Sequence, residues 1–344
     1  MQKVFVGLSG GVDSSVAALL LKQQGYLVTG VYMKNWSQSL PGFSCPWKED
    51  YQDAKRVAVQ LGIDFLLFDF EKQYKQKVVD YMLDEYRLGN TPNPDIMCNQ
   101  EIKFKLFLEA SMQAGADLVA TGHYAKTDKG HLYKARDQKK DQTYFLYRVS
   151  SSALEKTLFP LGDYLKTEIR EIATKNNLVT KDKKESMGIC FVGKVGIKDF
   201  LANFVNTEPG PVIDQHGIEV GTHDGAIFYT IGQRHGLKVG GGLPYFVTAK
   251  DMATNTVFVT SQLDDEKLWS RNIELVSCHY INARPSKNKN YQVRIRHQGE
   301  LLEAQIADSQ IKLKDAVKAL NPGQSVVIYD QREVLGGGII STTS

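Results

Sequence analysis

The first half of the chain alternates between short apolar runs and amphipathic stretches, and this alternation constrains the fold more than any other feature. We expect strands at Val4–Leu8, Leu27–Met33, Ile63–Phe70 and Asp117–Thr121, and helices at Asp13–Gln24, Glu49–Leu61, Glu71–Leu88, Asn99–Gln113 and Leu165–Leu178. Such an alternation predicts a mostly parallel sheet with helices on both faces. Ligands of these sheets bind beyond the carboxyl ends of the strands.

The character of the sequence changes near residue 205, where glycine and turn residues become frequent. Short runs such as Thr256–Thr260, Tyr291–Arg296 and Ser325–Tyr329 follow, and they are typical of small all-β modules. We therefore predict an α/β chain with three domains: a doubly wound parallel-sheet domain at 1–204, a small β-rich central domain at 205–267 and a C-terminal β-barrel at 268–344.

Composition excludes little by itself. Lys and Arg (42) barely outnumber Asp and Glu (39), so the net charge of +3 does not indicate a polyanionic partner. No apolar run is long enough to cross a bilayer and no signal peptide is recognisable, so we expect a cytoplasmic protein without a membrane partner. The four cysteines form no C-x-x-C pair, and we expect neither zinc nor an iron–sulfur cluster.

The stretch LSGGVDSS, Leu8 to Ser15, lies between the first strand and the first helix. Glycine backbone N–H groups can point into one concavity, and the helix behind them adds its positive end. The serine hydroxyls add donors, and Asp13 could help to hold a magnesium ion on a polyphosphate. The loop lacks the lysine of a Walker motif and the G-x-G-x-x-G of a dinucleotide site.

The pattern S-G-G-x-D-S-S resembles the pyrophosphate loop (PP-loop) of ATP pyrophosphatases, which transfer AMP to their substrate and release pyrophosphate. This resemblance implies MgATP as the nucleotide and an adenine-nucleotide alpha-hydrolase-like N-terminal domain. The residues expected to bind ATP are Gly7, Leu8, Ser9, Gly10, Gly11, Val12, Asp13, Ser14 and Ser15, with Met33 and Gly122 at the carboxyl ends of two other strands.

Further motifs narrow the choice among these enzymes. They are GNTPNPDIMCNQEIKF at 89–104, ATGHYA at 120–125, KDQTYFL at 140–146, ESMGICFVG at 185–193 and FYTIGQRHGLKVGG at 228–241. Together with the loop they resemble the tRNA-specific 2-thiouridylases, over nearly the whole chain and in the family's order. The resemblance implies adenylation of the C2 oxygen of the wobble uridine, followed by sulfur transfer that gives 2-thiouridine, AMP and pyrophosphate.

The family's catalytic residues match four positions. Cys190 corresponds to the persulfide carrier, Cys98 to the second catalytic cysteine and Asp95 to a general acid or base, while His123 is expected near the phosphates or the adenylated base. A helix that starts just after Cys98 would lower the pKa of its thiol. Cys45 and Cys278 are expected to be ordinary packed residues.

Two routes for the sulfur remain open. The Cys190 persulfide could attack carbon 2 directly, with Cys98 then closing a transient disulfide onto Cys190. Alternatively, Cys98 could release hydrosulfide from the persulfide, and hydrosulfide would then attack carbon 2.

The resemblance also implies RNA contacts, because the target base must leave the anticodon loop and enter a pocket. Asn93, Pro94 and Asp95 are expected to line that pocket, and Lys140, Asp141, Gln142, Arg294 and Ile295 to contact the tRNA anticodon stem-loop. Gln324 matches a further position of the family. The implied partners are tRNAs for lysine, glutamate and glutamine, and a cysteine desulfurase or sulfur-relay protein as donor.

Two other functions fit parts of the pattern. An amide- or guanidine-forming ATP pyrophosphatase would use the same loop without the cysteines. A non-catalytic RNA-binding protein could keep the nucleotide fold without turnover.

Overall fold

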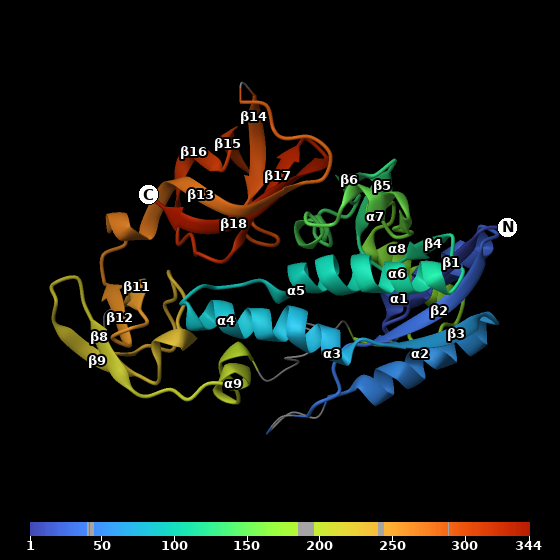
Figure 1. Cartoon of the computed structure of the whole chain (residues 1–344), viewed down its shortest axis with the longest axis horizontal. Helices are drawn as coiled ribbons and strands as arrows, with labels where there is room; N and C mark the ends of the chain where they lie inside the picture. Colours follow the sequence, from blue (N-terminus) through green and yellow to red (C-terminus); the bar gives the residue numbers. More distant parts are fainter. Residues whose placement is uncertain (40, 42–44, 185–195, 240–243, 288) are drawn as a thin grey trace.

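The computed structural model describes residues 1–39, 41, 45–184, 196–239, 244–287 and 289–344. Figure 1 shows three parts: a sheet with helices around it, a small β-rich part built from β8–β12, and a barrel above α4 and α5 that holds the C-terminus. The predicted fold class is confirmed, with a parallel-sheet N-terminal part, a central part and a C-terminal antiparallel barrel.

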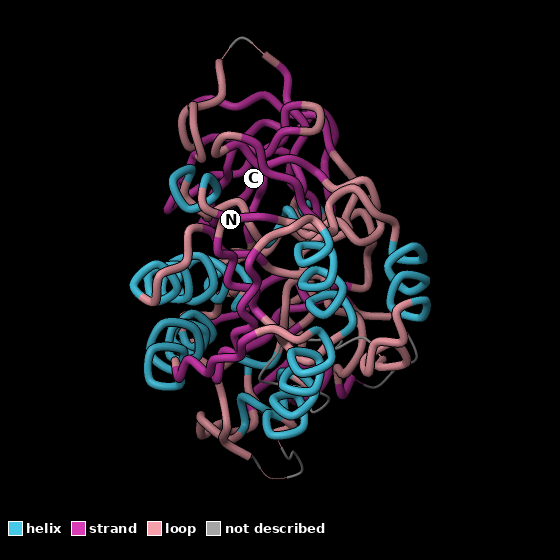
Figure 2. The backbone as a smooth tube through the Cα atoms, turned by 90° about the vertical axis from the view of Figure 1, so that its right-hand side faces the viewer, coloured by secondary structure: helices cyan, strands magenta, loops and turns pink. Residues whose placement is uncertain are grey.

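The N-terminal sheet has five parallel strands in the order β3-β2-β1-β4-β7. They are β1 (Lys3–Gly7), β2 (Leu27–Lys34), β3 (Asp64–Asp69), β4 (Leu118–Ala120) and β7 (Thr157–Leu158). One face of the sheet is covered by α1 (Val12–Gln23), α2 (Trp47–Leu61) and α8 (Lys166–Lys175). The other face is covered by α3 (Glu71–Tyr74), η1 (Lys75–Asp80), α4 (Tyr81–Arg87), η2 (Cys98–Leu106) and α6 (Phe107–Gln113). Figure 2 shows these helices around the strands.

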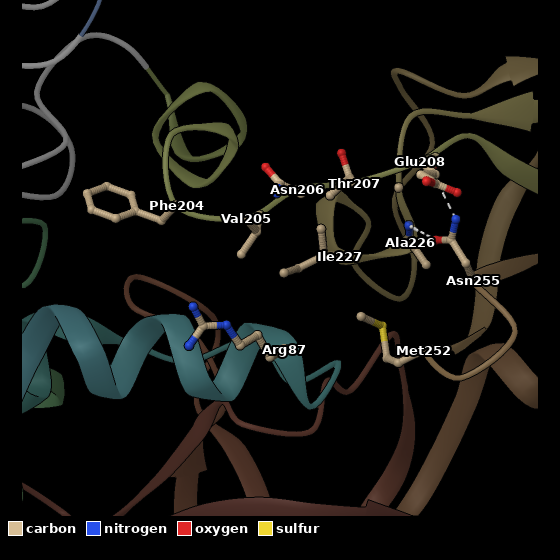
Figure 3. A pocket seen from close by; sticks show the side chains of 11 residues that line it. Arg87, Phe204, Val205, Asn206, Thr207, Glu208, Ala226, Ile227, Met252 and Asn255 are labelled. Atoms are coloured by element: carbon tan, nitrogen blue, oxygen red, sulfur yellow. Dashed lines mark hydrogen bonds between the residues drawn. The ribbon is translucent and has the colours of Figure 1, made fainter.

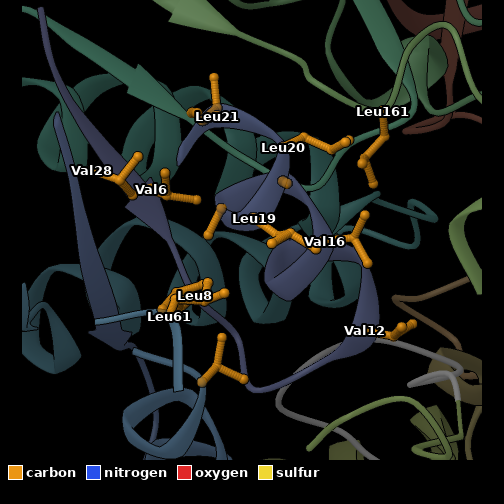
Figure 4. Packing of buried hydrophobic residues seen from close by; sticks show 14 of the residues in the cluster. Val6, Leu8, Val12, Val16, Leu19, Leu20, Leu21, Val28, Leu61 and Leu161 are labelled. Carbon is orange, nitrogen blue, oxygen red and sulfur yellow. The ribbon is translucent and has the colours of Figure 1, made fainter. Parts of the chain in front are cut away.

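Successive side chains of β1 point to opposite faces of the sheet, so this one strand contributes to the hydrophobic core on both faces. Val4 and Val6 pack with α1 and α2, whereas Phe5 between them packs with the helices of the other face. Period-two side chains that are apolar on both sides are what a sheet covered on both faces requires. Figure 4 shows α1 seated on this core through Val16 and Leu20.

Two predicted helices differ from the expectation. The stretch 71–88 is α3, a π-helix η1 and α4 in succession, and 94–113 is α5 (Pro94–Met97), a π-helix η2 and α6. The second helix therefore begins at Pro94 rather than Asn99, so Cys98 stands one turn inside it. The expectation that Cys98 lies directly before a helix start is wrong, because Asn93 caps the helix and Pro94 occupies its first turn.

A hairpin and short helices complete the N-terminal part. A turn at 127–130 joins β5 (Ala125–Asp128) to β6 (His131–Lys134), with Lys129 and Gly130 both at positive φ. The short helices are η3 (Thr143–Phe145), α7 (Ser151–Glu155) and α9 (Ile197–Ala202).

The central part is a five-stranded sheet in the order β10-β9-β8-β12-β11. Its strands are β8 (Gly210–Ile213), β9 (Glu219–His223), β10 (Lys238–Val239), β11 (Phe246–Asp251) and β12 (Thr256–Thr260), with η4 (Ala226–Phe228) between β9 and β10. Its core is small and centres on Val212, Val247 and Val257.

The C-terminal barrel follows η5 (Glu266–Leu268). Its strands are β13 (Trp269–Tyr280), β14 (Asn290–Arg294), β15 (Leu302–Ala307), β16 (Gln310–Lys318), β17 (Ser325–Asp330) and β18 (Glu333–Thr343). They follow the order β13-β16-β15-β14-β17-β18, and a β13–β18 pairing closes the barrel. Closure needs a bent β18, and Gly336 allows the close approach, since a Cβ there would lie 2.1 Å from the His279 carbonyl oxygen.

The barrel is joined to the N-terminal part by backbone hydrogen bonds. Strand β6 adds to the open edge of β18, where Tyr133 pairs with Glu333 and Leu132 with Val334. A second junction lies beside α5, where the Thr91 amide donates to the Pro322 carbonyl at 2.8 Å. The barrel is thereby held directly over the helices that carry Asp95 and Cys98 (Figure 1).

Candidate active site

Hydrogen bonds of its own serine side chains fix the conformation of the loop between β1 and α1. The Ser9 amide donates to Ser14 Oγ at 3.1 Å, and the Ser14 and Ser15 hydroxyls donate to the Gly11 carbonyl at 3.1 and 2.8 Å. Gly10 has φ +75°, and a Cβ there would lie 2.4 Å from the Asp50 carbonyl oxygen, so only glycine fits. The loop therefore lies at the carboxyl end of β1, against the start of α2.

Asp13 is fixed by partners from distant parts of the chain. Lys166, at the start of α8, donates to both of its carboxylate oxygens at 2.7 and 2.8 Å, and the Tyr124 hydroxyl donates at 3.0 Å. The Lys166 side chain is only 13% exposed. The lysine that the loop itself lacks is thus supplied by another element.

The strands next to the loop pack closely on it. A Cβ on Gly122, after β4, would lie 2.7 Å from the Ser14 amide nitrogen, and one on Gly7 would lie 2.9 Å from Cε of Met33. Met33 and Gly122 therefore lie near the loop, as expected for groups at carboxyl ends of neighbouring strands. Leu8 and Val12 are buried, so only their backbone can face a nucleotide.

A second group of predicted residues starts α5. Asn93 Oδ1 accepts from the amides of Asp95 and Ile96 at 3.1 and 3.3 Å, Pro94 is buried, and Cys98 follows one turn later with 4% exposure. Burial raises the pKa of the Asp95 carboxyl above its usual range, and the positive charge of Lys103 partly opposes this. Asp95 and Cys98 therefore share one short helical segment.

His123 lies in the loop after β4, directly after Gly122. Its ring packs against Phe104 and Phe159, with centroids 5.7 and 6.2 Å away. Its Nδ1 lies 2.8 Å from Thr121 Oγ1, and its Nε2 lies 3.5 Å from Lys103 Nζ. Burial, and secondly the Lys103 charge, lower the pKa of His123 well below its usual value, so the ring is neutral.

Cys190 falls outside the described residues, and so does its expected disulfide with Cys98. The chain that leads to it is anchored beside the loop. The Thr180 hydroxyl donates to Ser15 Oγ at 3.0 Å, and Lys183 donates to Asp50 and Asp53 at 2.8 and 2.6 Å.

The residues expected to contact RNA lie where the N-terminal part meets the barrel. Asp141 is 2% exposed and accepts from the Ala135 amide at 2.7 Å and the Thr143 hydroxyl at 2.5 Å, with Arg294 at 3.7 Å. Ile295 is buried. Three of the expected residues therefore pack the junction itself.

Lys140 and Gln142, the other two residues expected to contact RNA, are partly exposed. Gln142 accepts from the Tyr124 amide at 2.9 Å, and Lys140 lies beside it in the turn before η3. Gln324 is tied into the barrel through its backbone, which accepts from the Ile340 amide at 2.8 Å, next to Gly323 where the barrel touches Thr91.

Lys166, Tyr124 and Lys103 are the site residues that sequence reasoning missed. Lys166 follows Asp13 by 153 residues, so no local spacing connects them. Only their positions in the sequence could have indicated these residues: Lys166 begins a predicted helix, and Tyr124 follows the ATGH motif.

A cavity of about 510 Å³ lies away from all of these residues. It is bounded by Arg87 at the end of α4, by the segment 204–208 and by Met252 of the central part (Figure 3). Asn255 fixes its rim, accepting from the Ala226 amide and donating to the Glu208 carbonyl, both at 2.9 Å. The cavity separates the central part from α4 and contains none of the predicted site residues.

The remaining cysteines have simple surroundings. Cys45 is half-buried and its thiol donates to the Trp36 carbonyl at 3.4 Å. Cys278 is exposed, so the expectation that it is a packed residue is wrong. Within the ranges that the structure describes, no helix has both the length and the apolar character to span a membrane.

Comparison with known protein families covers almost all of the chain. Residues 2–194 match the tRNA methyl transferase HUP domain, 198–261 the tRNA methyl transferase PRC-barrel domain, and 270–340 the aminomethyltransferase beta-barrel domain. Among solved structures, a 4-thiouridine synthetase in complex with RNA and ATP is 20% identical over 59% of this chain and 50% of its own, with a TM-score of 0.38. The NMN synthetase from Francisella tularensis is 20% identical over 54% and 66%, with a TM-score of 0.37.

Curated relatives are much closer in sequence. The tRNA-specific 2-thiouridylase MnmA of Enterococcus faecalis is 46% identical over 98% of this chain and 95% of its own. The protein of the same name from Bacillus subtilis is 43% identical over 98% and 94%. At this identity and coverage, the chain belongs to the tRNA-specific 2-thiouridylase family.

Proposed function

We propose that the protein is a tRNA-uridine 2-sulfurtransferase that uses ATP to activate carbon 2 of the wobble uridine and then replaces its oxygen with sulfur. Membership of the 2-thiouridylase family supports the activity, and the loop after β1 supports the use of ATP. The observation that carries the proposal is a direct connection between two groups of residues. Gly122 packs on the Ser14 backbone, and the next residue, His123, contacts Lys103 of η2, which directly continues the helix that carries Asp95.

The first half of the reaction needs a phosphate site. Backbone N–H groups of the loop, the serine hydroxyls and the amino end of α1 offer donors to a nucleotide's phosphates. Lys166 places a positive charge beside Asp13 at the same position. These groups would stabilise the charge that moves to pyrophosphate as the uracil oxygen attacks the α-phosphate.

The predicted magnesium contact of Asp13 stays a prediction. Both oxygens of this carboxylate already accept from the Lys166 ammonium, so a metal ion bound there directly would have to displace that lysine. The geometry therefore fits Asp13 better as a hydrogen-bond acceptor for Lys166 than as a metal ligand.

The second half of the reaction needs sulfur. In our proposal the Cys190 persulfide supplies it, and Cys98 either closes a disulfide onto Cys190 or frees hydrosulfide, after which AMP leaves carbon 2. Cys98 is buried beside Asp95, so a base that enters there would be shielded from water. Both routes stay open, as do the identities of the persulfide donor and of the tRNA set.

For RNA binding we propose that Lys140 and Gln142 offer polar groups at the junction. Asp141, Arg294 and Ile295 would act by packing that junction, because all three are largely buried. Asn93, Pro94 and Asp95 would form one wall of the pocket for the extruded uracil.

The decisive experiment is incubation of the protein with MgATP, a persulfide donor and unmodified tRNA, followed by mass spectrometry of the nucleosides. We expect 2-thiouridine at the wobble position and one pyrophosphate per modification. Pyrophosphate release with a small metabolite but not with tRNA would instead identify a metabolite ligase. RNA binding without ATP turnover would identify a non-catalytic protein.

A further inference from the structure

A pair of aromatic rings lies where the motif KDQTYFL meets the barrel, and it has no part in the proposed reaction. Phe145 of η3 and His297, in the segment after β14, have ring centroids 4.3 Å apart and ring planes inclined at 41°. Both residues are partly exposed, whereas Tyr144 beside them is buried. Phe145 and His297, which we call the aromatic platform, therefore offer ring surface at the junction between the N-terminal part and the barrel.

Hydrogen bonds from both parts of the chain hold the aromatic platform in place. The hydroxyl of buried Tyr144 donates to the first carbonyl of β17 at 2.8 Å, and the Tyr144 ring lies edge-on to Phe145 with centroids 5.6 Å apart. Gln298, next to His297, donates to the Lys139 carbonyl at 2.9 Å. Because the two rings are already fixed, a ligand that stacks on them would lose little binding energy to the ordering of side chains.

The aromatic platform is one contact away from the helix that carries the predicted catalytic groups. Asn99 directly follows Cys98 in η2, is 2% exposed, and donates through Nδ2 to the Phe145 carbonyl at 3.1 Å. Lys140 and Gln142, which we expect to contact RNA, lie just before η3. A base stacked on the platform would therefore be a close neighbour of the base that reaches Cys98.

The chemistry of the aromatic platform favours a nucleobase over a phosphate. The side chain of Phe145 has no hydrogen-bonding group. Burial, and secondly the charge of Arg294, lower the pKa of His297, so its ring is neutral near pH 7 and attracts a phosphate only weakly. Flat, uncharged rings bind the face of an unpaired base, and this kind of binding depends little on which base it is.

We propose that the aromatic platform of Phe145 and His297 binds, by stacking, the unpaired nucleotide next to the target uridine of the anticodon loop. This inference rests on the proposed function. When the target uridine leaves the loop, its neighbour loses a stacking partner, and a protein ring takes the place of that partner. The platform thus lowers the cost of extrusion, and it acts on the affinity for tRNA rather than on adenylation or sulfur transfer.

The test compares Phe145→Leu with Phe145→Trp, because leucine keeps much of the apolar volume but has no aromatic face. We expect F145L to raise the Kd for unmodified tRNA about five- to a hundredfold, and F145W to bind like wild type. Tyr133→Leu is the matched control, since Tyr133 forms a second partly exposed ring pair with His131, on the β5–β6 hairpin. Y133L should bind tRNA like wild type.

A tRNA with an abasic nucleotide on one or the other side of the target uridine identifies the stacked base. One of the two abasic tRNAs should bind wild type as weakly as intact tRNA binds F145L, and the F145L substitution should weaken it no further. Independent losses with both abasic tRNAs would overturn the proposal, as would an unchanged Kd of F145L or an equal loss in Y133L.

Two further outcomes separate the platform from folding and from the proposed function. If F145L does not fold, His297→Leu takes its place, with the same results expected and the same results contradicting the proposal. Wild type that neither binds tRNA nor forms 2-thiouridine would reject the proposed function itself. Wild type that forms 2-thiouridine, together with an F145L that binds tRNA equally well, would reject the platform alone.

Discussion

In the proposed ATP site, Asp13 would organise the contacts to phosphate without touching a phosphate itself. Its two oxygens hold Lys166, which is nearly buried, and Tyr124 holds Asp13 in turn. A lysine in this position can move from the carboxylate to a phosphate oxygen over a short distance. If a nucleotide binds there as proposed, the charge is already in place and little reorganisation is needed.

Lys166→Met should therefore slow pyrophosphate release. Hydrogen bonds to charged groups contribute about 1.5–3 kcal/mol, which corresponds to a loss of about ten- to a hundredfold in rate. The measurement is single-turnover pyrophosphate release with tRNA at saturating ATP. Lys175→Met, on the exposed end of the same helix, is the control. A K166M rate within about twofold of wild type would exclude a role for this lysine.

Cys98→Ser separates the two halves of the proposed reaction. Adenylation does not need the thiol, so pyrophosphate release should continue, whereas 2-thiouridine should fall by at least about a hundredfold because serine cannot replace a sulfur nucleophile. Nucleoside mass spectrometry and a pyrophosphate assay on the same sample would measure both. Cys278→Ser, at an exposed thiol, should leave both yields unchanged. Full 2-thiouridine formation by C98S would contradict the assignment.

At the scale of elements, the close packing of Gly122, just after β4, against the start of α1 determines the conformation of the loop between β1 and α1. Gly122→Ala would place a methyl group 2.7 Å from the Ser14 amide nitrogen, in contact with backbone that cannot move away. We expect a destabilisation of about 1–3 kcal/mol in urea unfolding, together with weaker ATP binding.

Gly11→Ala is the matched variant for that experiment. A Cβ there meets only Ser9 Oγ, at 3.4 Å, and φ is an ordinary −94°. Its free energy of unfolding should stay within about 0.5 kcal/mol of wild type. Equal destabilisation by both substitutions would show that the contact with Ser14 is not the cause.

The same elements show what the sequence could and could not predict. The parallel sheet and the position of the loop followed from the alternation of strands and helices, because that pattern is local. The start of α5 was misplaced although Asn93 and Pro94 form a recognisable helix start. The π-helical pattern of η2 has no comparable sequence signature, so Lys103 could not be separated from the other lysines of its helix.

At the scale of the whole molecule, a buried ion pair holds the junction between the N-terminal part and the barrel. Asp141 keeps its bonds to Ala135 and Thr143 when Arg294 is removed, but it loses its counter-charge. Breaking such a pair costs about 3–5 kcal/mol. Arg294→Met should therefore lower the free energy of unfolding by that order, as measured by urea denaturation.

Lys314→Met is the control, because it removes one partner of an ion pair on the exposed surface of the barrel. Its pair with Glu303 is exposed on both sides, so its loss should cost no more than about 1 kcal/mol. Equal effects of the two substitutions would mean that the Arg294 pair is not structural. The long-range pair itself could not be predicted, since Asp141 and Arg294 were expected to face RNA rather than each other.

The attachment of β6 to β18 has a consequence for how the enzyme selects its RNA. The β5–β6 hairpin belongs to the same sheet as the barrel strands, so backbone hydrogen bonds at this edge restrict hinge motion between the hairpin and the barrel. For the proposed reaction, such a junction would favour a substrate that deforms, because a uridine in a single-stranded loop leaves its stack at lower cost than a paired one.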